Sequence, residues 1–178
     1  RYAKPEFGLD TTVIDGAHVA VTEEVVLERP FCQLRRFKRD CRRDDPKVLL
    51  VAPLSGHYAT LLRDTVRALL PEHDVYITDW HNARDVAVAD GVFGFSDYVD
   101  TVVAFLAHVG EGAHVVAVCQ PCVQVLAAVA LMAEDKHPCT PRSMTLIRWW
   151  LASTLLHAAQ WGVLSVVLLT PGSPQAES

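Results

Sequence analysis

The stretch HVVAVCQPCVQVLAAVALM, residues 114–132, decides the fold. It begins as an apolar strand, turns sharply through Cys119, Gln120 and Pro121, and continues as a helical pattern of small apolar residues. A sharp turn between strand and helix is the layout of a nucleophile elbow, which presents the turn side chain above the sheet. Ala117 meets the need for a small neighbour, and Pro121 replaces the usual glycine but suits the first turn of a helix.

The thiol of Cys119 has two interpretations. As a nucleophile, it lies at the positive end of a helix dipole, which favours the thiolate, and the Gln120 N–H points at a developing oxyanion. As a structural residue, it is a buried thiol, the commoner fate of an unpaired cysteine. Cys122 lies one turn into the helix and is predicted to pack, and the remaining cysteines have no catalytic setting (Cys32, Cys41, Cys139).

Apolar runs alternate with helical patterns on both sides of this stretch. Predicted strands are KVLLVAPL (47–54), DVYITDW (74–80), HVVAV (114–118) and SMTLI (143–147). Predicted helices are 57–71, 96–110 with Ser96 as N-cap and Gly110 at its end, and the segment after Pro121. The segment 18–37 suits one or two antiparallel strands at the first edge of the sheet. The order predicts an α/β fold, with a mostly parallel sheet and helices on both faces.

Ligands of an open parallel sheet collect at the carboxyl ends of its strands, so the loops there are informative. PLSGH (53–57) follows one strand, and the backbone around Ser55, Gly56 and His57 suits the second half of an oxyanion hole. The alternative is an ordinary turn with His57 capping the next helix. Trp80 ends another strand as an apolar wall for substrate or, alternatively, as a core residue.

Composition bounds the classes of function. The chain has 178 residues, 51% hydrophobic and 21% charged, which fits one globular domain. A net charge of -5 gives no field for nucleic acid, since the cationic cluster 35–43 is followed at once by Asp44 and Asp45. Five cysteines without a repeated Cys-x-x-Cys pair, and no signal segment, predict a reducing cytoplasm, no disulfides and no zinc site. No cofactor is predicted.

The C-terminal run WWLASTLLHAAQWGVLSVVLL, residues 149–169, carries no charge and is about long enough to cross a bilayer. A tail anchor is therefore one interpretation. Its positive flank is only Arg148, and His157, Gln160 and Gly162 interrupt it, so a membrane partner is expected only if this span is real.

Several segments together resemble the intracellular polyhydroxyalkanoate (polyhydroxybutyrate) depolymerases. The resemblance covers residues 2 to 147, and the conjunction of SGHYATLLR, DVYITDW and AVCQP is more specific than any of them alone. The matching segments are 7–16, 25–39, 46–86, 115–136 and 141–147.

The resemblance implies an α/β-hydrolase-like fold and hydrolysis of the ester bonds of poly(3-hydroxybutyrate) at cytoplasmic granules. Cys119 matches the family's nucleophile. The implied reaction is acyl transfer through a thioester, with 3-hydroxybutyrate units released to water or another acceptor such as a thiol. The implied partner is the polymer or its granule surface.

The chain departs from that family after residue 147. The family's catalytic aspartate and histidine follow this point, and neither is found here; His157 is not expected to replace the histidine. We therefore expect residues 1–147 to be the N-terminal portion of a depolymerase domain, truncated after the strand at 143–147, and 148–178 to be a divergent apolar tail. Codons for Leu151 to Thr154 can spell Gly-Ile-Asp one frame over, so a frameshifted end is a hypothesis that the gene sequence tests.

Two functional classes follow from this departure. The first is a cysteine-dependent ester hydrolase whose activity is impaired. The second is a non-catalytic truncated product that binds granules or a membrane. In either case the missing strands would leave an apolar edge uncovered, so homo-oligomers or aggregates are expected.

Overall fold

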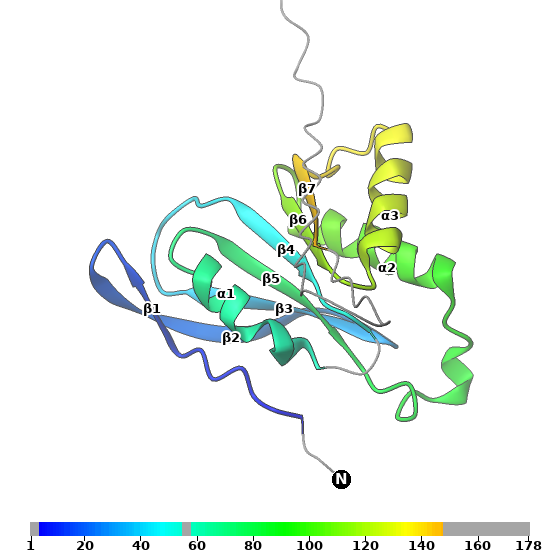
Figure 1. Cartoon of the computed structure of the whole chain (residues 1–178), viewed down its shortest axis with the longest axis horizontal. Coiled ribbons are helices and arrows are strands. Elements are labelled where there is room, and N and C mark those ends of the chain that lie inside the picture. The colour runs from blue at the N-terminus through cyan, green and yellow to red at the C-terminus, as the bar shows by residue number, and fades with distance from the viewer. Residues whose placement is uncertain (1–3, 55–57, 148–178) are drawn as a thin grey trace, which may run out of the picture.

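The computed structural model describes residues 4–54 and 58–147, which form a seven-stranded sheet with helices on both faces (Figure 1). The strand order is β1-β2-β3-β5-β4-β6-β7. The strands are β1 (Thr11–Ile14), β2 (Ala17–Arg29), β3 (Cys32–Arg39), β4 (Lys47–Val51), β5 (Asp74–Trp80), β6 (His114–Val118) and β7 (Ser143–Ile147).

The sheet has a parallel part and an antiparallel part. Strands β5, β4, β6 and β7 run parallel, and β1, β2 and β3 join them by antiparallel pairing. The parallel strands alternate with helices along the chain, as the sequence predicted, because a parallel connection needs a crossover. The predicted antiparallel segment 18–37 is also confirmed as the hairpin of β2 and β3.

The first edge of the sheet differs from the prediction. The sequence analysis placed it at 18–37, but β1 pairs outside β2 through a two-residue turn at Asp15 and Gly16. Both turn residues have positive φ, 50° and 81°. Asp-Gly at such a turn is a strong hairpin signal, since its backbone twist matches that of the paired strands.

The two faces of the sheet bury different helices. The α1 face combines the 3-10 helix η1 (Ala59–Leu62) and α1 (Arg63–Leu69) with alternate strand residues such as Leu50 and Ile77. The opposite face combines α2 (Phe95–Val109) and α3 (Cys122–Glu134) with Leu49 and Val115. Successive side chains of a strand point to opposite faces, so buried strands carry continuous apolar runs. A short 3-10 turn, η2 (Val88–Asp90), precedes α2.

The start of α2 corrects a predicted cap. Ser96 was expected at the N-cap, but the helix begins at Phe95 with Gly94 as its N-cap. Asp97 provides the reason, because its carboxylate accepts the Gly94 N–H at 2.7 Å and closes the first turn one step earlier. The predicted end at Gly110 is confirmed, with φ at 90°.

In the described ranges, no helix is both long and apolar enough to span a bilayer. The run 149–169 lies outside the described residues, so the tail-anchor interpretation stays a prediction.

Candidate active site

The carboxyl ends of β4, β5, β6 and β7 meet at one edge of the sheet, because these strands are parallel and adjacent. Cys119 follows β6 at this edge, and the loop with Ser55 to His57 follows β4. The two predicted halves of an oxyanion hole therefore leave neighbouring strands. This juxtaposition is what an elbow-based acyl-transfer site requires.

Cys119 has the backbone of a nucleophile elbow. Its φ is 70°, in the left-handed region that residues other than glycine rarely adopt. Its N–H donates to the Ile147 carbonyl at 2.7 Å, which ties the turn to the end of β7, and the Cys119 side chain is exposed. A strained, exposed thiol at the carboxyl end of a central strand contradicts the buried-thiol interpretation.

Gln120 lies exposed in the turn between β6 and α3. Within the described part of the chain, its backbone N–H makes no hydrogen bond, and its predicted role as an oxyanion donor stays a prediction. Ser55, Gly56 and His57, the predicted second half of the hole, lie outside the described residues.

The beginning of that loop is anchored by β5. The Ala52 N–H donates to Thr78 Oγ1 at 2.9 Å, and the Ala52 carbonyl accepts Trp80 Nε1 at 2.9 Å. Both backbone groups of Ala52 are therefore satisfied by side chains of the adjacent strand. This arrangement fixes where the chain leaves β4 toward the predicted oxyanion loop.

Trp80 is a core residue rather than an open wall, with 8% of its surface exposed. Its ring centroid lies 4.3 Å from that of Tyr98 and 5.7 Å from that of Phe93. Phe93 in turn stacks on Phe31 at 4.8 Å. Trp80 therefore supports an aromatic cluster from behind, which matches the core-packing alternative of the sequence analysis.

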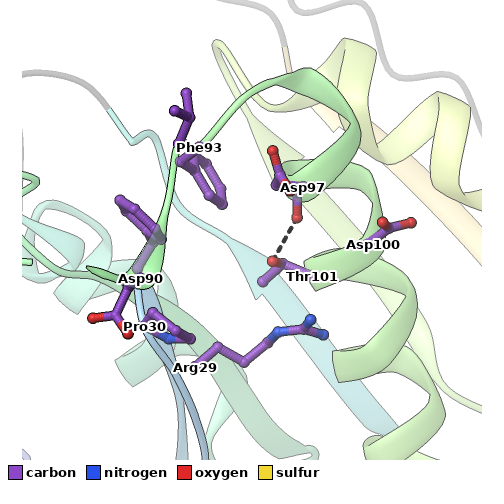
Figure 2. A pocket seen from close by; sticks show the side chains of 9 residues that line it. Arg29, Pro30, Asp90, Phe93, Asp97, Asp100 and Thr101 are labelled. Carbon is purple, nitrogen blue, oxygen red and sulfur yellow. Dashed lines mark hydrogen bonds between the residues drawn. The ribbon is translucent and has the colours of Figure 1, made fainter. Parts of the chain in front are cut away.

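A pocket of about 180 Å³ lies beside this cluster. Figure 2 shows Arg29 and Pro30 facing Asp97, Asp100 and Thr101 of α2, with Phe93 above them. The lining is completed by Phe31, Asp90 and Val92. The sequence analysis did not single out any of these residues, because the pocket joins the β2–β3 turn to the start of α2.

The pocket shares the carboxyl edge with Cys119 but lies at a distance from it. Its β2–β3 turn adjoins β3, and Cys32 of β3 pairs with Trp80 at the end of β5. Strands β5 and β4 lie between β3 and β6, so about 14 Å of strand spacing separates β3 from the strand that carries the elbow. The pocket lining does not include Cys119 or Gln120.

A general base for Cys119 is not found among residues 4–54 and 58–147, where its Sγ makes no hydrogen bond to a histidine or carboxylate. His81 contacts the Pro30 carbonyl at 3.1 Å, and His114 contacts Ser143 Oγ at 2.7 Å. His114 begins β6 while Cys119 follows its end, and burial lowers the His114 pKa. His157 lies outside the described residues.

A buried carboxylate, Asp79, ends β5 on the α1 face and is fully enclosed. Lys4 Nζ donates to its carboxylate, as do Gln33 Nε2 at 2.7 Å and Arg35 Nε at 2.6 Å. Burial alone raises the pKa of Asp79, but these donors outweigh it and the net pKa is lowered. The network ties the N-terminal segment to the edge of the sheet that carries the site.

We expect Asp79→Asn to lower the free energy of unfolding by about 2 kcal/mol at neutral pH, because charge-assisted hydrogen bonds are lost. A depressed carboxyl pKa stabilises the fold above its ordinary value of 3.8, and this stability is lost as the pH falls through the lower folded pKa. Urea unfolding at pH 7 and pH 3 measures the difference between variant and wild type, which should shrink at pH 3. The exposed Asp64→Asn is the matched control, and a gap independent of pH would contradict the assignment.

Comparison with known proteins adds the fold family. No protein-family model and no curated protein matches the sequence. Among solved structures, epoxide hydrolase A from Mycobacterium thermoresistibile has a TM-score of 0.51 at 18% identity, covering 71% of this chain and 39% of that one. A bacterial membrane phospholipase A has a TM-score of 0.52 at 16% identity, covering 71% and 39%. The fold is α/β-hydrolase-like. The chain spans about two fifths of the length of these two structures.

This fold family explains the placement of the predicted residues. In α/β-hydrolases the nucleophile occupies the elbow after a central strand, and a neighbouring loop supplies an oxyanion donor. In this chain Cys119 and Gln120 follow β6, and residues 52–54 follow β4. In the described ranges, no group of three or more His, Cys, Asp or Glu side chains is arranged to hold a metal ion.

Proposed function

We propose that this chain carries the nucleophile half of an ester hydrolase and that Cys119 is acylated by the ester. The observation that supports the proposal is the elbow itself, an exposed thiol at φ 70° on the carboxyl end of β6. A left-handed cysteine costs about 1–2 kcal/mol, which a purely structural position would avoid with glycine or asparagine.

The reaction begins when the Cys119 thiolate attacks the ester carbonyl, forming a C–S bond and an oxyanion. The N–H of Gln120 and a donor from the loop after β4 stabilise that oxyanion. Collapse breaks the ester C–O bond, the alkoxide takes a proton from water and leaves as the alcohol, and a thioester remains. Water then attacks the thioester and releases the acid. Because no base contacts Cys119 in the described residues, we propose that deacylation is the slow step.

The proposed substrate is poly(3-hydroxybutyrate), and the proposed place is the surface of cytoplasmic polymer granules. The support is the resemblance of residues 2–147 to intracellular depolymerases, together with a fold shared with ester-cleaving enzymes such as the phospholipase A. The pocket beside Phe93 lies where a neighbouring unit of a long polymer could rest.

The test is capture of the acyl group by the full chain. A chromogenic ester, 4-nitrophenyl butyrate, is expected to release a burst of about one 4-nitrophenol per chain, followed by slow turnover. Peptide mass spectrometry should find one butyryl group on the peptide that contains Cys119. Release of 4-nitrophenol without an acylated cysteine, or no release from a folded chain, would overturn the proposal.

A second candidate function is binding of the polymer surface without turnover. It is favoured by three exposed apolar side chains between β5 and the start of α2, namely Val88, Val92 and Phe95, with Val88 96% exposed and Val92 91% exposed. Val92 also lines the pocket. Apolar side chains held in water beside a candidate site are typical of a surface that binds an apolar partner.

We expect the double variant Val88→Ser/Val92→Ser to reduce co-sedimentation with poly(3-hydroxybutyrate) granules by about tenfold or more. Burial of a valine side chain contributes about 1.5–3 kcal/mol, and about 1.4 kcal/mol corresponds to tenfold in affinity. The matched control is Val13→Ser, since Val13 is an exposed valine on β1 at the other end of the sheet. Equal binding of all three proteins would remove this surface from the proposal.

The side of the sheet beyond β6 supports the predicted self-association. Among the described residues, β7 is the last strand on this side, and α3 beside it exposes Val123, Leu126 and Leu131. Unpaired strand edges and apolar helix faces favour contact between copies. We expect sedimentation velocity of the full chain to show dimers or larger species; a stable monomer at micromolar concentration would contradict this expectation.

A further inference from the structure

The elbow carries a second cysteine that the proposed hydrolysis does not use. The sequence Cys119-Gln120-Pro121-Cys122 spans the turn from β6 into α3. Cys119 is exposed, whereas Cys122 is 8% exposed. Cys-x-x-Cys at the start of a helix in a β-α unit is the spacing of redox-active dithiols.

The backbone holds the two residues within the span of a disulfide. The Cys122 N–H donates to the Cys119 carbonyl at 3.4 Å, which is the hydrogen bond of a four-residue turn. The Cα atoms of such a turn lie within about 7 Å, and disulfides span about 4.4–6.8 Å. A disulfide between the two residues is therefore compatible with the span of this turn.

The Ile147 carbonyl contacts both Cys119 and Cys122. It accepts the Cys119 N–H at 2.7 Å and lies 3.7 Å from Cys122 Sγ, which also contacts the Ala117 carbonyl at 3.6 Å. The Cys122 thiol thus lies under the elbow, at the ends of β6 and β7, rather than deep along α3.

The other cysteines provide no comparable pair. Cys32 is fully buried on β3, and burial raises the pKa of its thiol well above the ordinary range, so it is unreactive. Cys139 follows α3 and contacts the Ala107 carbonyl at 3.8 Å, and Cys41 follows β3. Within the pair Cys119 and Cys122, the exposed Cys119 is the residue that an external oxidant reaches first.

We infer that Cys119 and Cys122 form a redox-active pair, in which exposed Cys119 reacts with a small-molecule disulfide and buried Cys122 resolves the product. The Cys119 thiolate attacks one sulfur of the external disulfide, a mixed disulfide forms, and one thiol leaves. The Cys122 sulfur then attacks Cys119 Sγ, the second external thiol leaves, and a Cys119–Cys122 disulfide remains. Two protein thiols are oxidised and one external disulfide is reduced to two thiols.

The pair has a consequence for hydrolysis that rests on the proposed function. A disulfide occupies the sulfur that would attack the ester, so closure removes the nucleophile and reduction restores it. The same closure also protects Cys119 from irreversible oxidation, since a resolving thiol diverts the reactive sulfur into a reversible bond.

Oxidised glutathione added to the reduced full chain tests the pair without any need for esterase activity. After acid quench and alkylation, the peptide that contains both cysteines should lack two hydrogens and carry no alkyl group, and dithiothreitol should reverse this. Cys122→Ser and Cys122→Ala should instead retain glutathione on Cys119. Cys139→Ser is the matched control and should close like the wild type.

A stable glutathione adduct on wild-type Cys119, or no reaction of either cysteine in a folded chain, would overturn the pair. The wild-type peptide mass decides the matter even if both Cys122 variants unfold. Acylation by 4-nitrophenyl butyrate should fall at least tenfold in the closed form. If the disulfide forms but the reduced chain shows no esterase activity, the redox pair is supported and the proposed hydrolase is contradicted. Failure of the redox pair and failure of the hydrolase are therefore distinguishable.

Discussion

Alanine at position 119 is expected to abolish acylation by 4-nitrophenyl butyrate, with a loss of about a thousandfold or more in the burst rate. The physical reason is that the thiolate supplies the bond-forming electron pair, and removal of a nucleophile leaves only the oxyanion donors and substrate binding. Stopped-flow release of 4-nitrophenol measures the burst. Cys139→Ala is the matched control, because Cys139 is a partly exposed cysteine beyond the far end of α3.

One outcome of this comparison would argue against the assignment. Equal bursts from Cys119→Ala and the wild type would identify another nucleophile or an unspecific reaction. A loss caused by unfolding is excluded by Cys119→Gly, which removes the thiol and suits the φ of 70°. Glycine relieves the left-handed strain, so the free energy of unfolding of this variant should lie within about 1 kcal/mol of the wild-type value. Loss of the burst in this stable variant isolates the chemistry.

The elements near the elbow could be predicted because local pattern and tertiary structure agree there. HVVAV is an interior strand with Val115 and Ala117 buried and Val116 and Val118 partly buried, and a helix follows it directly, so the apolar pattern could be recognised locally. The same holds for β5, where DVYITDW matches the observed strand residue for residue. The exposure of Cys119 follows from its place in the turn, which the sequence also locates.

The features that sequence analysis missed depend on contacts between distant segments. Lys4 reaches Asp79 across the sheet, and Phe31 stacks on Phe93 from a different strand connection. Such pairings follow from strand order, which periodicity does not specify. The pocket could not be predicted for the same reason, since its walls come from the β2–β3 turn and the start of α2. The additional edge strand β1 was locally detectable, because Asp15-Gly16 is a hairpin signal.

Alanine at Trp80 is expected to lower the free energy of unfolding by about 3–5 kcal/mol, the largest stability effect among the changes considered. Deleting the indole removes buried area and leaves a cavity between Tyr98 and Phe93. Urea unfolding followed by far-ultraviolet circular dichroism measures the loss. The matched comparison is Phe95→Ala, which shortens an aromatic side chain that is 53% exposed; an equal loss there would contradict a core role for Trp80.

Trp80→Phe separates the two roles of the indole. A smaller aromatic ring replaces the indole, so part of the packing survives, but the Nε1 donor to the Ala52 carbonyl is lost. That carbonyl keeps only the Tyr98 hydroxyl at 3.5 Å, so a cost of about 1–2 kcal/mol is expected. Because Ala52 marks the point where the chain leaves β4 toward the predicted oxyanion donors, the acylation burst of a folded Trp80→Phe chain should slow more than in Val13→Ser. An unchanged burst would mean that Trp80 holds the core alone and does not position the loop after β4.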